Sequence, residues 1–249
     1  MSDWMATFHP RTLQHAVCVA VCMVIMVGTS LLGLSLRARP AGDRLRIGIG
    51  VVGILYWIGS NIWWNLPKNF DVSESLPLQV CDLAGLIGPL ALLTRKRQLR
   101  AILYFWGLVL SSQGFIQPIL DVGAGHTRFW LFWANHTIIV GMAMYDLVAL
   151  QFRPTWRDFF TAAGAILIYL ILILPFDIVL DVNYGYVGNR SAAQKTIIDS
   201  LGPWPWRIAP LAAIALGAMA IMVLPWEFVR RREIPASDES KPADGNGQA

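Results

Sequence analysis

Residues 101–119 read AILYFWGLVLSSQGFIQPI, nineteen positions without a charged side chain. At about 1.5 Å per residue, a helix of this length covers most of the roughly 30 Å hydrocarbon core of a bilayer. The whole chain has the same character, since 55% of its 249 residues are hydrophobic and 14% are charged. Soluble domains carry roughly a quarter of charged residues. We therefore expect this chain in a membrane.

Seven stretches of this kind predict an all-α fold, a polytopic membrane bundle of seven transmembrane helices. The predicted spans are residues 12–36, 47–66, 76–93, 101–119, 129–152, 159–180 and 208–226. They form a single seven-helix transmembrane domain over residues 1–229, and the polar composition of residues 230–249 predicts a disordered cytoplasmic tail. This layout excludes a receptor with an ectodomain, a pump with its own ATPase and a nucleic-acid reader.

The basic residues between the spans predict the orientation, because Lys and Arg of short loops accumulate on the cytoplasmic side. Fourteen of the twenty fall on one side: Arg37, Arg39, Arg44, Arg46, Arg95, Lys96, Arg97, Arg100, Arg153, Arg157, Arg230, Arg231, Arg232 and Lys241. The other side has six: Arg11, Lys68, Arg128, Arg190, Lys195 and Arg207. We expect the N-terminus outside and the C-terminus in the cytoplasm, in agreement with an odd number of spans.

The net charge of +4 is interpreted mostly as an orientation signal. It indicates membrane lipids as partners, because basic loops contact anionic lipid head groups, and it indicates no nucleic acid. Nothing in the sequence specifies an oligomeric state.

Patterns that resemble cofactor or metal motifs are interpreted as helix packing. Gly48, Gly50 and Gly53 match the dinucleotide-binding spacing but lie in an apolar span, without the strand and helix that this motif needs. Cys18 and Cys22 share a helix face, and buried free cysteines behave as small hydrophobic residues. The four histidines lack H-x-x-x-H spacing. We expect no soluble cofactor and no metal site.

Polar residues of six spans collect near the predicted outer side. They are Asn61, Asn65, Gln79, Cys81, Asp82, Gln113, Gln117, Asp121, Asn135, His136, Asp177, Asp181, Asn183 and Tyr184, with residues 204–207 at the start of the last span. Intramembrane polar groups are costly and often mark functional sites, so the cluster predicts a polar cavity open to the outer leaflet. Helix ends at the membrane surface are polar in any case, which leaves a purely structural interpretation open.

Two residues of this cluster have the chemistry of a nucleophile and its base. Cys81 and His136 lie roughly 7 and 10 Å into their predicted helices, at about 1.5 Å per residue. A thiol becomes reactive as the thiolate, and imidazole has a suitable pKa to accept the proton near neutrality. Both residues are thus expected at the same depth in the membrane, which is the depth of glycerolipid ester groups. We therefore consider the hypothesis that they form a catalytic Cys/His dyad. Packing roles for both residues remain the alternative.

Several short motifs in a fixed order resemble a known family. They are SLPLQVCDLA at 75–84, YFWGL at 104–108, QP at 117–118, FWANH at 132–136, RP at 153–154, NYGY at 183–186 and LGPWPW at 201–206. Over roughly residues 40–228 the chain resembles the YwaF-like bacterial integral membrane proteins, which are similar to the eukaryotic transmembrane protein 164 family. The resemblance implies a bacterial cytoplasmic (inner) membrane protein.

The eukaryotic branch is known as a cysteine-dependent acyltransferase that moves acyl chains between phospholipids. By motif, the resemblance implies Cys81 as the nucleophile and His136 as the base. Bacterial members often have a histidine where this sequence has Gln79. The expected substrate-binding residues are Gln79, Asp82, Gln113, Gln117, Asn135, Asn183, Tyr184, Arg128 and Arg207, with the amides contacting an oxyanion or head group and the arginines holding phosphate.

Three functions follow as hypotheses. The first is a cysteine-dependent phospholipid acyltransferase or lipid hydrolase. The second is a transporter or binding protein for a small polar solute, which would need polar groups continuing inward, where the sequence offers little besides Asp146. The third is a non-catalytic membrane scaffold.

Overall fold

The structure, a computed structural model, describes residues 4–190 and 197–233. Apart from one isolated bridge between Thr7 and Val122, its regular elements in these ranges are helices. The elements are α1 (Leu13–Leu36), α2 (Pro40–Trp64), α3 (Val80–Thr94), α4 (Arg97–Ile102), η1 (Leu103–Ser111), α5 (Gln113–Ile116), α6 (Thr127–Val148), α7 (Trp156–Leu180), η2 (Tyr184–Tyr186), η3 (Ile197–Leu201), α8 (Ile208–Ile221) and α9 (Leu224–Glu233). The predicted all-helical fold is confirmed.

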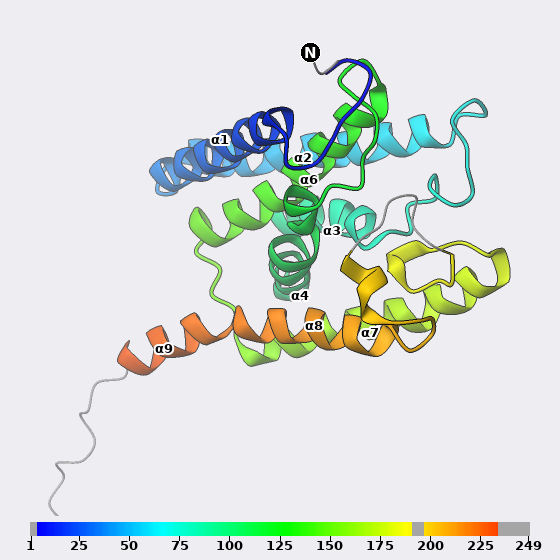
Figure 1. Cartoon of the computed structure of the whole chain (residues 1–249). Helices are drawn as coiled ribbons and strands as arrows, with labels where there is room; N and C mark the ends of the chain where they lie inside the picture. The colour runs from blue at the N-terminus through cyan, green and yellow to red at the C-terminus, as the bar shows by residue number, and fades with distance from the viewer. Residues whose placement is uncertain (1–3, 191–196, 234–249) are drawn as a thin grey trace, which may run out of the picture.

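The long helices pack in three layers (Figure 1). α1 and α2 lie together on one side, and α7 and α8 lie together on the other. Between them, α3, α6 and the continuous α4–η1 segment form the middle layer, in which α6 packs on α1 and α3 packs on α2. The middle layer is therefore the part of the bundle best shielded from lipid.

Six helices are long and apolar enough to cross a membrane, among them the continuous segments Arg97–Ile116 and Ile208–Arg232. The multi-pass membrane character is thereby confirmed. α3 is also apolar but has 15 residues. It begins at Val80 rather than at the predicted Leu76, because the backbone N–H of Gln79 donates to the Asp82 carboxylate over 3.2 Å and ends the preceding extended segment.

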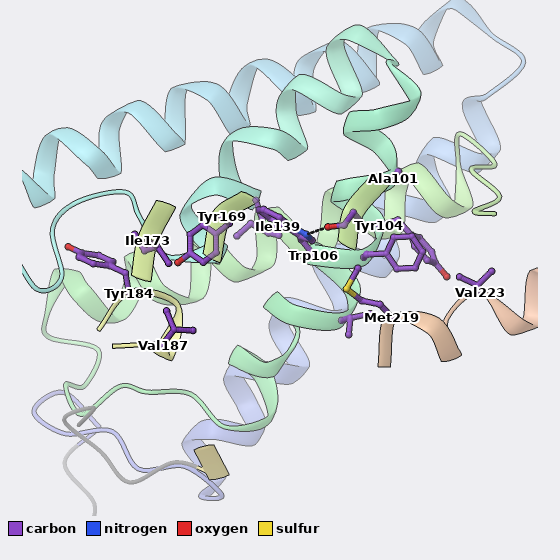
Figure 2. Close-up of a cluster of buried hydrophobic side chains, with 14 of the residues drawn as sticks. Ala101, Tyr104, Trp106, Ile139, Tyr169, Ile173, Tyr184, Val187, Met219 and Val223 are labelled. Carbon is purple, nitrogen blue, oxygen red and sulfur yellow. Dashed lines mark hydrogen bonds between the residues drawn. The ribbon is translucent and has the colours of Figure 1, made fainter. Parts of the chain in front are cut away.

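The central segment Leu103–Ser111 is wound as a π-helix. A Cβ at Gly107 would meet the Ala143 methyl of α6 at 2.9 Å, so glycine lets the two helices approach closely. The core around this segment is aromatic. Figure 2 shows Trp106 beside Tyr169 and Tyr104 near Met219, so that one continuous cluster joins η1 to α7 and α8. π-helical turns of this kind occur frequently at functional sites.

The predicted basic loops gather at one end of the bundle, which we call the basic end. Arg46 of α2 donates to the Leu92 carbonyl at the end of α3. Arg97 pairs with Asp158 at 2.6 Å, where α7 begins. These contacts tie the start of α2 to the end of α3, and the start of α4 to the start of α7.

The C-terminal helix also belongs to the basic end. Arg230 donates to the Pro154 carbonyl over 2.8 Å and pairs with Glu227. Three arginines in its last turn interact favourably with the helix dipole. α9 therefore extends to Glu233, four residues into the stretch that was predicted as a disordered tail. Residues 234–249 of that prediction lie outside the described part.

The opposite end, which we call the polar end, is held by loop contacts. The Tyr184 hydroxyl donates to the Val72 carbonyl over 2.7 Å, and Tyr169 donates to the Leu78 carbonyl over 2.8 Å. In Figure 1 the loop after α2 and the loop after α7 accordingly lie at the same end. The chain leading into α3 is thus anchored on α7 and on the loop that follows it.

Candidate functional site at the polar end

Cys81 lies in the first turn of α3 and is half-buried. Its thiol lies beside the hydroxyl of Ser111, the last residue of the π-helical segment. Ser111 is fully buried, and its oxygen has no hydrogen-bond partner among the described residues. A buried hydroxyl without a partner is costly and is rare unless a ligand or a functional role accounts for it.

Asp82, the residue after Cys81, is held by two hydrogen bonds. Its carbonyl accepts a hydrogen bond from the Trp57 indole of α2 over 2.9 Å, and its carboxylate accepts the Gln79 N–H. In the described ranges no cation pairs with this half-buried carboxylate. The start of α3 therefore places a thiol and an unpaired acid side by side.

His136 is buried on α6, and its orientation follows from one hydrogen bond. Its Nδ1 lies 2.8 Å from the Phe132 carbonyl. Because a carbonyl only accepts, Nδ1 carries the hydrogen in the neutral ring and Nε2 keeps a lone pair. The ring is flanked by Phe132 and Phe115 at centroid distances of 4.3 and 6.2 Å. A Cβ at Gly114 would collide with the imidazole, so the ring lies against the backbone of α5.

Cys81 and His136 therefore contact one short segment at positions three residues apart, Ser111 and Gly114. Their helices are neighbours, since a Cβ at Gly85 of α3 would lie 3.2 Å from the Asn135 amide oxygen of α6. No direct hydrogen bond joins the thiol and the imidazole among the described residues. Catalytic pairs are often loose before substrate binds.

The predicted amide ligands divide into two groups. Gln79 uses its Oε1 to accept the Gly185 N–H over 2.9 Å, which leaves its amide nitrogen as a donor. Gln113 is exposed and Gln117 half-buried, and within the described chain neither side chain makes a hydrogen bond. Asn135 faces Gly85. These four side chains retain hydrogen-bonding capacity for a ligand.

Asn183 and Tyr184, by contrast, are used by the fold. The Asn183 side-chain oxygen accepts the Gly188 N–H over 2.9 Å. The fully buried Tyr184 donates its hydroxyl to the Val72 carbonyl, and the same oxygen accepts the Leu76 N–H over 3.2 Å. Burial raises the pKa of this hydroxyl to about 12. Both residues shape the loop over the site, where the Tyr184 hydroxyl is fully used and Asn183 keeps its amide nitrogen as a donor.

The two predicted phosphate ligands differ in burial. Arg128 is half-buried, with 42% of its side chain exposed, pairs with Glu74 at 2.8 Å and lies over the Trp64 ring. Arg207 is buried and donates to the Gly188 carbonyl, and its Nε has no partner among the described groups. Arg207 therefore keeps an unused donor beside the loop over the site, whereas Arg128 is already neutralised.

Tyr186 is a site residue that the sequence prediction missed. It follows Gly185, and both have a left-handed backbone with φ of 63°, which is uncommon for a tyrosine. Its side chain interacts electrostatically with Cys81 and Asp82, and no hydrogen bond of its hydroxyl is found in the described ranges. The NYGY motif contains two tyrosines, and only the fold distinguishes the structural Tyr184 from Tyr186.

Cys18 and Cys22 pack in a cluster around Phe8 and Met26, as the packing interpretation predicted. Within residues 4–190 and 197–233, no three His, Cys, Asp or Glu side chains are grouped so that they could hold a metal ion.

The comparison with protein families agrees with the motifs. A model of the TMEM164 family matches residues 8–223. The chain belongs to the TMEM164 family. No curated protein and no solved structure matches it. The matched range of this TMEM164-family protein includes Cys81, Ser111, His136 and Tyr186, and it ends just before α9.

Proposed function

We propose that this TMEM164-family protein is a cysteine-dependent acyltransferase or hydrolase of phospholipid esters, with Cys81 as the nucleophile and His136 as the base. The observation that carries the proposal is the hydrogen bond from His136 Nδ1 to the Phe132 carbonyl. It fixes the tautomer in which Nε2 is free to accept a proton. The imidazole also lies against Gly114, on the segment whose residue Ser111 touches the Cys81 thiol.

The proposed reaction has two half-reactions. Nε2 of His136 takes the proton of the Cys81 thiol, and the thiolate attacks the ester carbonyl carbon of a phospholipid. The tetrahedral intermediate collapses, the carbon–oxygen bond breaks, and the lysophospholipid leaves with the proton from His136. The acyl thioester on Cys81 is then attacked by a second lipid hydroxyl or by water, which gives its proton to His136 and releases the thiolate.

Hydrogen-bond donors around Cys81 suit the negative charges of the proposed reaction, which are those of the oxyanion and of the head-group phosphate. In this proposal the oxyanion donors are the free amide nitrogen of Gln79, two residues before Cys81, and the hydroxyl of Ser111 beside the thiol. Such donors act most strongly in a dry site. The unused Nε of Arg207 suits the phosphate of a head group, because guanidinium groups bind phosphate well. The remaining proposed substrate-binding residues are Asp82, Gln113, Gln117 and Asn135.

We further propose seven crossings, with the N-terminus outside and the C-terminus cytoplasmic, in a bacterial inner membrane. α3 would be the seventh crossing. Trp57 of α2 contacts the start of α3 and Arg46 contacts its end, so the two helices run antiparallel over about ten residues. The 15 residues of α3 span roughly 22 Å, and the extended residues 76–79 before it would supply part of the remaining depth.

The transport hypothesis receives less support. Asp146, the acidic residue toward the basic end, is 2% exposed and pairs with Arg100 at 2.9 Å. It is neutralised within the bundle, and thus offers no continuation of a polar path.

The test is the covalent intermediate. Purified protein is incubated with a fluorescent phosphatidylcholine, and intact-mass spectrometry should find one acyl group that neutral hydroxylamine removes. Cys81→Ala should abolish the adduct and acyl transfer, whereas Cys22→Ala, which also removes a thiol inside the bundle, should retain both. Acyl transfer that persists in Cys81→Ala would overturn the proposal.

A further inference from the structure

A cavity of about 400 Å³ lies at the basic end, far from Cys81. It is lined by Gly33, Arg37, Ala38, Gly42, Asp43, Arg95, Tyr145, Ala149 and Leu150. These residues come from the ends of α1, α3 and α6 and from the start of α2. Tyr145 follows His136 by nine positions on α6, roughly 13 Å along the helix axis. The cavity is thus separate from the site proposed for acyl transfer.

Two of the lining residues are arginines with unused donors. Arg37 and Arg95 follow the last residues of α1 and α3, and their exposed side chains make no hydrogen bond or ion pair within residues 4–190 and 197–233. Each guanidinium offers a planar set of donors that matches phosphate oxygens. Two such groups around one cavity create a positive site.

The single acidic residue of the lining does not cancel this charge. The Asp43 carboxylate accepts the Nε of Arg46 over 3.1 Å, and Arg46 is otherwise occupied by the carbonyls of Leu92 and Leu93. Asp43 is therefore balanced by an arginine outside the lining. Among the described residues Arg37 has no acidic partner, and Arg95 has only the longer-range attraction of Asp146, whose carboxylate is already paired with Arg100.

Tyr145 supplies a neutral donor. The residue is 1% exposed and lines the cavity, and its hydroxyl makes no hydrogen bond within the described chain. A side chain at Gly33 would collide with the Tyr145 ring, so a glycine of α1 makes room for it. A hydroxyl without a protein partner beside a cavity is suited to bind a ligand oxygen.

We infer that this cavity binds a phosphate group through Arg37, Arg95 and the Tyr145 hydroxyl. Its volume is in the range of small-molecule sites. The cavity also lies among the basic loops, where the phosphates of lipid head groups are found if these loops face the membrane surface. A phospholipid head group and a free phosphate share this chemistry. The site does not depend on the proposed reaction at Cys81.

The test measures binding to the purified full-length protein in a non-ionic detergent, with inorganic phosphate in one titration and dihexanoyl phosphatidylglycerol in the other. The variant Arg37→Gln/Arg95→Gln should weaken binding at least tenfold, because each charge-assisted hydrogen bond contributes strongly. Tyr145→Phe should weaken it several-fold. The matched control is Arg44→Gln/Arg157→Gln, which removes two exposed arginines of the same end that do not line the cavity.

Tighter binding of phosphatidylglycerol than of phosphate would assign the site to a lipid head group, and equal binding would assign it to free phosphate. Both of these results support the inference, provided that Arg37→Gln/Arg95→Gln loses binding and the control variant does not. Equal losses in the cavity and control variants would overturn it, because binding would then follow total charge. Failure of both probes to bind the unmodified protein would also overturn it. The melting temperature of each variant verifies that it is folded.

Discussion

Arg100 of α4 donates its Nε to both carboxylate oxygens of Asp146 on α6, at 2.9 and 3.0 Å. The side chains are only 15% and 2% exposed, and the Arg100 guanidinium lies 4.8 Å from the centre of the Phe152 ring. This buried pair joins two helices of the middle layer at the basic end. It accounts for a charged residue within a predicted span without assigning it a catalytic role.

Asp146→Asn should therefore destabilise the protein strongly. The substitution leaves the Arg100 guanidinium buried without its counter-charge, and breaking a buried pair in this way costs about 3–5 kcal/mol. Thermal unfolding in detergent measures the effect. Asp43→Asn is the control, because that carboxylate is 67% exposed and exposed pairs contribute little. A melting temperature of Asp146→Asn no lower than that of Asp43→Asn would contradict the structural role.

The two tyrosines of the NYGY motif should respond differently to loss of the hydroxyl. Tyr184→Phe removes hydrogen bonds to Val72 and Leu76 and should lower the free energy of unfolding by about 1–3 kcal/mol. Tyr186→Phe removes no hydrogen bond between described residues, and should change stability by less than about 0.5 kcal/mol. It should nevertheless alter the rate at which a membrane-permeant maleimide labels Cys81.

Thermal unfolding and maleimide labelling together test this pair. An equal loss of stability in both variants would show that Tyr186 is also structural. Unchanged labelling of Cys81 in Tyr186→Phe would remove Tyr186 from the proposed site.

The turn before α3 should open at acidic pH. Ser73 donates its backbone N–H and its hydroxyl to the Asp71 carboxylate, at 2.8 and 2.7 Å, and these bonds lower the pKa of Asp71. A lowered pKa in the folded state stabilises the turn above the unfolded pKa of about 3.9, and this contribution is lost as the pH falls through the folded value. Hydrogen–deuterium exchange of residues 71–76, corrected for intrinsic rates, should rise in that range.

Ser73→Ala removes the hydroxyl donor and should shift this opening to higher pH. Identical exchange profiles for Ser73→Ala and the unmodified protein would exclude the Asp71–Ser73 contact as its cause.

The sequence predicted the membrane fold and its helices well because length and the absence of charge determine both. It predicted less well where a helix boundary depends on tertiary contacts. α3 begins at Val80 because of the Asp82 cap and because the preceding loop is held by Tyr169, and α9 persists because Arg230 reaches Pro154. Neither contact has a periodic signature in the sequence.

The same distinction holds at the candidate site. Residue type and depth selected Cys81 and His136 as candidates, and their roles remain a proposal. They could not assign Tyr184 to the loop and Tyr186 to the site, because that depends on the left-handed backbone at residues 185 and 186. They also could not select Ser111. A serine hydroxyl within an apolar span can bond to its own helix, as Ser112 does with Leu108, or it can face another residue. The sequence looks the same in both cases.

Ser111→Ala should separate stability from activity. The hydroxyl is buried beside Cys81 without a partner among the described residues, so its removal should leave the melting temperature unchanged or slightly higher. If the hydroxyl donates to the Cys81 thiolate or to the oxyanion, the rate of acyl-adduct formation should fall at least tenfold. Ser112→Ala, which removes a neighbouring hydroxyl bonded to Leu108, should keep the normal rate, and Ser111→Thr should recover part of it. A Ser111→Ala protein that forms the adduct at the normal rate would exclude Ser111 from the chemistry while leaving Cys81 in its proposed role.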